Sequence, residues 1–246
     1  MNTVRSGLPA RQISTISLLL VIAIIIAVVA GCSNKPDEPE STPAPPIITA
    51  AEAVVRSRDA MANLSSFKFE LTHDSGSTAL SGGLELSQAG GTVLQDGLDL
   101  EAEATIGRAF VRIEAVVIDN RTWMTNPLTG TWAEIPPEDS PFSFLDPVKL
   151  VADILGETQD ASYPEDRPPS GVSTVEGRIP ATTLAALVGI VDPDAIPDVT
   201  LTLDADSYLL KKIVIRGVAQ AEDDASTTRV ITLSGFDDPV VLEPPI

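Results

Sequence analysis

The stretch Leu98-Asp99-Leu100-Glu101-Ala102-Glu103-Ala104-Thr105-Ile106 decides the fold of this chain. Apolar and polar side chains alternate along its whole length. Because successive side chains of a β-strand point to opposite faces, this period of two places the aliphatic residues on one side of a sheet and the carboxylates on the other. One face is therefore buried while the other meets water, which is typical of an antiparallel sheet.

The same alternation recurs before and after this stretch. We expect further strands at 67–72, 80–87, 111–117, 198–204, 208–218 and 228–236. The turn Asn126-Pro127-Leu128-Thr129-Gly130 joins Trp123 to Trp132 as another hairpin, and Ala205-Asp206-Ser207 is the turn of the later hairpin.

Three segments show a helical period instead. A helix over 50–63 begins at the capping-box pattern Thr49-Ala50-Ala51-Glu52. A second, over 144–156, starts near Asp146-Pro147 with proline at its first position, and a short third helix lies within 181–190. Because helices and strands do not alternate one for one, the pattern predicts an α+β fold with an antiparallel sheet.

The N-terminus has the features of a lipoprotein signal peptide. Arg5 and Arg11 precede the uncharged run 17–30, which leads into Val29-Ala30-Gly31-Cys32 with the only cysteine of the chain. This pattern predicts removal of residues 1–31 and attachment of lipid to Cys32, which would anchor an extracytoplasmic protein to the cell membrane. The alternative is an uncleaved anchor with a chance cysteine, but the apolar run is shorter than the roughly 18–20 residues that a spanning helix needs.

The segment 32–49 contains the lipidated cysteine and a proline-rich tether, and a domain follows over 50–246. After removal of 1–31, 14 Lys and Arg remain against 35 Asp and Glu, a net charge near −21. This charge repels polyanions, so nucleic acid is not expected as a partner.

Groups that could perform catalysis are scarce. The single histidine, His73, is most simply a surface residue, and no serine lies in a Gly-x-Ser-x-Gly elbow. Asp204-Ala205-Asp206 lacks the glycine and distal glutamate of a calcium loop, and Gly82-Gly83 and Gly90-Gly91 lack the context of a phosphate-binding loop. We therefore expect no enzyme activity, no metal and no cofactor.

Several segments, in this order, resemble the LppX/LprAFG family of bacterial lipoproteins and, at lower similarity, the LolA/LolB-type lipoprotein carriers. They are 51–64 leading to Ser66-Phe67-Lys68-Phe69, Ile118-Asp119-Asn120-Arg121-Thr122-Trp123, Phe144-Leu145-Asp146-Pro147, Val175-Glu176-Gly177-Arg178-Ile179, 198–212 and 231–240. The resemblance covers about 50–246.

This resemblance implies a curved antiparallel half-barrel whose concave face is covered by helices around an apolar cavity for the acyl chains of lipids or glycolipids. The inward positions that we expect to line the cavity are Phe67, Phe69, Leu84, Leu86, Leu100, Ala102, Val111, Ile113, Ala115, Leu201, Leu203, Ile213, Ile215, Ile231 and Leu233. The expected function is an anchored lipid binder and carrier, with a membrane transporter as a candidate partner. The alternative is a non-enzymatic interaction or signalling lipoprotein of the envelope with a filled core, and the volume of the cavity distinguishes the two.

Overall fold

The fold was obtained from a computed structural model, which describes residues 48–119, 121–136, 139–140, 142–164 and 171–246. The signal peptide predicted over 1–31, the predicted lipidation site Cys32 and the predicted tether lie outside the described residues. Residues 48–246 belong to one compact unit.

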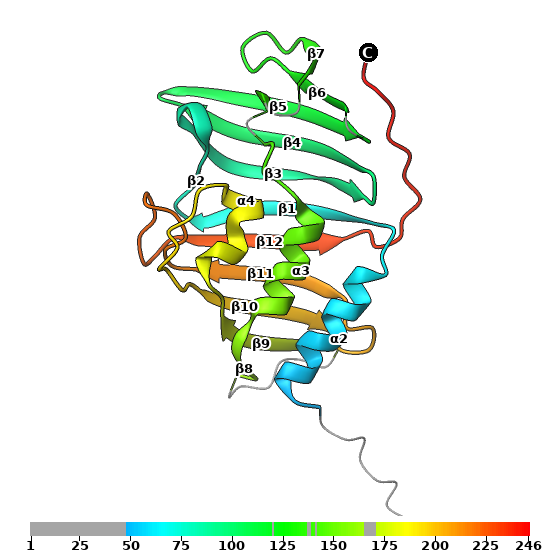
Figure 1. The fold of residues 1–246 in the computed structure, drawn as a ribbon, viewed down its shortest axis with the longest axis vertical. Coiled ribbons are helices and arrows are strands. Elements are labelled where there is room, and N and C mark those ends of the chain that lie inside the picture. The colour runs from blue at the N-terminus through cyan, green and yellow to red at the C-terminus, as the bar shows by residue number, and fades with distance from the viewer. Residues whose placement is uncertain (1–47, 120, 137–138, 141, 165–170) are drawn as a thin grey trace, which may run out of the picture. The chain divides into compact units, whose positions relative to one another are not determined.

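Twelve strands form one open sheet in which the first and the last strand of the chain are neighbours. The order is β7-β6-β5-β4-β3-β1-β12-β11-β10-β9-β8, with β2 paired to β3 (Figure 1). The strands are β1 Ser66–Ser75, β2 Thr78–Ala79, β3 Leu84–Leu94, β4 Gly97–Ile106, β5 Ala109–Ile118, β6 Arg121–Thr125, β7 Trp132–Ile135, β8 Gln159–Ser162, β9 Val172–Arg178, β10 Asp198–Asp204, β11 Leu210–Arg216 and β12 Thr228–Ser234. All these pairings are antiparallel, as the alternation predicts.

Three α-helices cover the same face of this sheet: α2 Ala50–Ala62, α3 Pro147–Glu157 and α4 Ala185–Val188 (Figure 1). A 3₁₀ turn over Ala181–Leu184 precedes α4. Together with the open, curved sheet, this arrangement confirms the expected α+β half-barrel.

Both longer helices begin where the sequence predicts. The Thr49 hydroxyl accepts a hydrogen bond from the Glu52 N–H at 3.2 Å, and Asp146 accepts one from the Lys149 N–H at 2.9 Å. The reciprocal half of the capping box is replaced by another contact, because the Glu52 carboxylate accepts a hydrogen bond from Arg56 at 2.5 Å. Pro147 occupies the first turn of α3, where a missing N–H costs nothing.

The two faces of the sheet differ as the period of two requires. Leu100, Ala102 and Ala104 of β4 are at most 1% exposed and face the helices, whereas Asp99 and Glu101 are exposed on the outer face. The apolar residues of both halves of the sheet join the buried faces of the helices in one core.

The strand expected over 80–87 begins later than predicted. Ser81–Gly83 form a 3₁₀ turn in which Gly82 has φ 74° and Gly83 has φ 75°, values that break an extended strand. The strand β3 then runs on to Leu94 through Gly90-Gly91. A Cβ at Gly91 would lie 1.8 Å from the Asp99 carbonyl oxygen, so β3 and β4 approach too closely there for any other residue.

The sheet edge formed by β8 was not predicted. Gln159–Ser162 follow α3 directly and pair with β9, which extends the sheet by one short strand. The hairpin turn at 205–207 is confirmed, since the Asp204 carboxylate accepts hydrogen bonds from the N–H groups of Asp206 and Ser207 at 3.2 and 2.9 Å.

Candidate functional site

All fifteen predicted cavity residues are buried and belong to the single core between sheet and helices. The structure thus brings them together on one face. Whether they touch a ligand depends on where this core contains space.

A wide groove of about 1010 Å³ opens at one end of the core. It lies between the α2–β1 connection, the β3–β4 and β5–β6 turns and the first turns of α3. Its apolar wall includes Leu64, Phe67, Leu98, Leu145 and Pro147.

Two small voids continue from the groove beneath α3 and α4, each of about 20 Å³. The first shares Phe67, Leu145 and Pro147 with the wide groove, and both voids share Leu187 of α4. A void of this size has room for about one water molecule, so the middle of the core is filled in this conformation.

A second open hollow, of about 530 Å³, lies at the other end of the core and is called the far hollow below. It shares Leu80 and Phe144 with the second void. The wide groove, the two voids and the far hollow are therefore neighbours that share wall residues, and Ser143 lines both the wide groove and the far hollow.

Five of the fifteen predicted residues line these spaces, namely Phe67, Phe69, Leu86, Ile231 and Leu233. The other ten lie in packed core away from them: Leu84, Leu100, Ala102, Val111, Ile113, Ala115, Leu201, Leu203, Ile213 and Ile215. Ligand contact by any of the fifteen stays a prediction.

Sequence reasoning missed the wall contributed by the helical layer. Leu145, Leu150, Val151 and Leu187 line the first void from above, and Phe142 and Phe144 line the second. A signal was present, because 145–155 has a clear apolar stripe that must face the sheet.

A buried polar network beside the far hollow joins the sheet to the end of α4. The side chains of Arg229 and Asp223 are 0% and 3% exposed and form a two-pronged ion pair, with N···O distances of 2.9 and 2.8 Å. Gln220 extends it by donating to the Ala79 and Val188 carbonyls at 2.8 and 3.1 Å, which ties strand β2 to the end of α4. Burial alone would raise the pKa of Asp223, but hydrogen bonds from Arg229 and from the backbone outweigh it and lower this pKa.

His73 belongs to the same network rather than to an open surface. Its Nδ1–H donates to the Ser87 carbonyl at 2.8 Å, because a carbonyl can only accept. Its Nε2 then accepts from the Thr78 hydroxyl at 2.9 Å, and that oxygen accepts from Arg229 Nε at 2.9 Å. Burial, with Arg229 as a further cause, lowers the pKa of His73, so the ring is held neutral. The expectation of a plain surface histidine is therefore wrong.

Comparison with known proteins identifies the family of this chain. The sequence profile described as LppX_LprAFG lipoprotein matches residues 49–242. The chain belongs to the LppX_LprAFG lipoprotein family. Comparison with functionally curated proteins finds no match.

Two solved structures of mycobacterial proteins share the fold of this LppX_LprAFG member. LprF from Mycobacterium bovis is 18% identical with a TM-score of 0.59, over 80% of this chain and 96% of LprF. LppX from Mycobacterium tuberculosis is 16% identical with a TM-score of 0.55, over 79% of this chain and 98% of LppX. At these identities the likeness concerns the fold alone.

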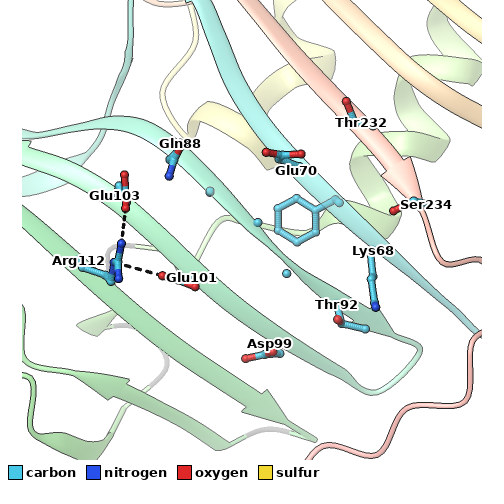
Figure 2. A pocket seen from close by; sticks show the side chains of 14 residues that line it. Lys68, Glu70, Gln88, Thr92, Asp99, Glu101, Glu103, Arg112, Thr232 and Ser234 are labelled. Atoms are coloured by element: carbon cyan, nitrogen blue, oxygen red, sulfur yellow. Dashed lines mark hydrogen bonds and ion pairs between the residues drawn. The ribbon is translucent and has the colours of Figure 1, made fainter.

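The outer face of the sheet carries a different kind of hollow. A groove of about 510 Å³ lies over Gly90-Gly91 of β3, where side chains are absent, and polar side chains surround it (Figure 2). Arg112 bridges Glu101 and Glu103 at 3.2 and 2.6 Å on one wall. Burial and the neighbouring Glu101 raise the pKa of Asp99. Such polar walls would not receive an acyl chain, which leaves the concave face as the candidate lipid site.

The described residues offer little other chemistry. Among them there is no group of three or more His, Cys, Asp or Glu that could hold a metal ion. Nor does this part of the chain contain a helix of sufficient length and apolar character to cross a membrane.

Proposed function

We propose that this LppX_LprAFG lipoprotein binds and carries lipid between its helical layer and its sheet, without enzymatic chemistry. The observation that carries the proposal is the set of neighbouring spaces beneath the helices, in which the wide groove, the two voids and the far hollow share apolar wall residues. In this proposal Cys32 holds the protein at the outer side of the cell membrane, and the predicted tether lets the domain reach lipid.

The middle of the core must widen to accept an acyl chain, because voids of about 20 Å³ are too small for one. Widening is least costly beneath α3, whose buried residues Leu150, Val151, Ile154 and Leu155 are all apolar, since apolar contacts have no preferred direction. A chain held there is spared roughly 0.8 kcal/mol per CH₂ that exposure to water would cost. Apolar walls suffice for this task.

The filled middle of the core also favours a second candidate function. A closed domain with no ligand would act as an envelope interaction or signalling lipoprotein, as the small central voids suggest. The two candidates differ in whether the purified protein contains lipid.

Native mass spectrometry of the full chain, released from detergent, tests the lipid proposal. We expect masses that exceed the lipidated polypeptide by one or more bound lipids. Leu187→Trp, which fills both voids from α4, should reduce the bound fraction severalfold while the protein stays folded. Leu128→Trp is the matched control, since Leu128 is 81% exposed in the β6–β7 turn. Wild-type protein that binds no added lipid would refute the carrier and favour the interaction protein.

Anchoring is tested separately at Cys32. Cys32→Ser removes the only thiol, so the protein should be neither lipidated nor cut after Gly31. The mass of the intact chain and its partitioning into detergent measure both effects. Unchanged mass and partitioning would contradict lipidation at Cys32.

A further inference from the structure

We propose that the wide groove holds the lipid headgroup and discriminates against headgroups with net negative charge. This inference rests on the proposed function and assigns the charge class of its ligand. It follows from the charged groups that surround the groove and from what each of them already contacts.

Three carboxylates and one ammonium group are among the residues lining the groove: Asp96, Asp119, Asp146 and Lys149. The Asp119 N–H donates to the Asp96 carbonyl at 2.9 Å, which holds the β3–β4 and β5–β6 turns together. Two acidic side chains thus come from turns that lie side by side at the rim of the groove.

The positive groups lining the groove already have acidic partners within the protein. Lys149 forms an ion pair with Asp153, one turn further along α3. The N-terminus of α3, where free N–H groups would attract a phosphate, is capped by the Asp146 carboxylate. An anionic headgroup would therefore meet carboxylates without finding an unpaired cation among the described lining residues.

A fourth carboxylate lies directly behind the rim. Asp237 accepts hydrogen bonds from the Ser65 N–H and hydroxyl at 2.7 and 2.8 Å, and Ser65 lines the groove. These hydrogen bonds lower the pKa of Asp237, so it remains charged at neutral pH. The negative potential at the groove is therefore built from several elements of the fold.

The opposite end of the core offers no better place for an anion. The charged residues lining the far hollow are Asp192 and Glu222. The nearby guanidinium of Arg229 is buried and paired with Asp223. Uncharged headgroups with hydroxyl groups can donate hydrogen bonds to the carboxylates of the groove, whereas phosphate groups would be repelled.

The test is a competition for the full chain in detergent between two lipids with identical acyl chains. Monogalactosyl dioleoylglycerol has an uncharged hydroxylated headgroup, and dioleoylphosphatidylglycerol has an anionic one. Native mass spectrometry should show the galactolipid preferred by about tenfold at low ionic strength, with the preference shrinking as salt screens the carboxylates. In Asp96→Asn/Asp119→Asn the preference should fall severalfold, and asparagine is compatible with the positive φ of 54° at position 119.

The control is Asp194→Asn/Asp206→Asn, which removes the same charge from exposed loops outside the groove and should leave the preference unchanged. Equal binding of both lipids by the wild type, or an equal change in both double variants, would overturn the inference and leave the proposed function standing. Failure of both lipids to bind would instead refute the proposed function, and the inference with it.

Discussion

The two ends of the core beneath the helices are built differently. At the wide groove, hydrogen bonds join one loop to another, as between Asp119 and Asp96. At the far hollow, buried groups join the sheet to the helical layer, since Arg229 of β12 reaches Gln220, and Gln220 reaches the end of α4. The difference teaches which end can open. Lifting α4 would break the buried hydrogen bond from Gln220 to the Val188 carbonyl, whereas opening the groove separates mainly apolar surfaces, so we expect lipid to enter from the groove.

The largest effect should come from breaking the ion pair beside the far hollow, which we call the closed end because buried hydrogen bonds join the sheet to α4 there. Arg229→Met leaves the Asp223 carboxylate buried without its partner and should lower the free energy of unfolding by about 3–5 kcal/mol. Chemical denaturation of the full chain measures this loss. Arg229→Met/Asp223→Asn should recover part of it, because the remaining amide is uncharged and still accepts from the backbone. A single variant as stable as the wild type would show that the network does not close this end.

The next effect separates packed core from the voids. Leu201 is 0% exposed and lines none of the four spaces described above, so Leu201→Phe should cost roughly 1–3 kcal/mol by overpacking. Leu187→Phe, which faces both voids, should cost less than about 1 kcal/mol because adjacent space receives the ring. The two variants are compared by their melting temperatures and by the amount of lipid extracted from each purified protein. A tolerated Leu201→Phe that loses lipid would support the wider cavity that the sequence predicts.

A smaller effect should appear at the open end. Asp146 caps α3 beside the groove, and Asp146→Ala should cost about 1 kcal/mol of unfolding free energy. Asp146→Ser, which keeps a capping oxygen, should restore most of it. Both substitutions remove a charge from the groove, so only the stability measurement separates the capping role from the electrostatic one. Equal destabilisation by Asp146→Ala and Asp146→Ser would contradict the capping role of Asp146.

The smallest effect concerns pH at the closed end. Because the pKa of His73 is lowered in the folded protein, the unfolded chain binds the proton more readily. Stability should therefore be complete above the unfolded pKa of about 6.5 and fall as the pH drops below it, by at most about 1.4 kcal/mol per pH unit. Since the chain has one histidine, His73→Gln should flatten the dependence between about pH 5.5 and 7.5. A dependence that survives in His73→Gln would assign it to other groups.

Much of the fold can be predicted from local patterns. The alternation along 98–106 established that Leu100, Ala102 and Ala104 are buried, because the pleat of a strand sends every second side chain to the same face, but Ile106 at the strand end is 38% exposed. Asp146-Pro147 established the start of α3 because its signals act within one helical turn. The edge strand β8 was missed because Gln159–Ser162 are mostly exposed and have no apolar period to detect.

The sequence by itself determined the alternating faces of the sheet, the helix starts and the family resemblance, since each depends on neighbouring residues. Only the tertiary structure decided where the core is filled and where it is open. Arg229 shares the inward face of β12 with Ile231 and Leu233, so its burial follows from the alternation, but its partner Asp223 comes from a loop without any period. The hollows likewise depend on how side chains from distant segments fill a shared volume, and packing of that kind is not encoded in any local pattern.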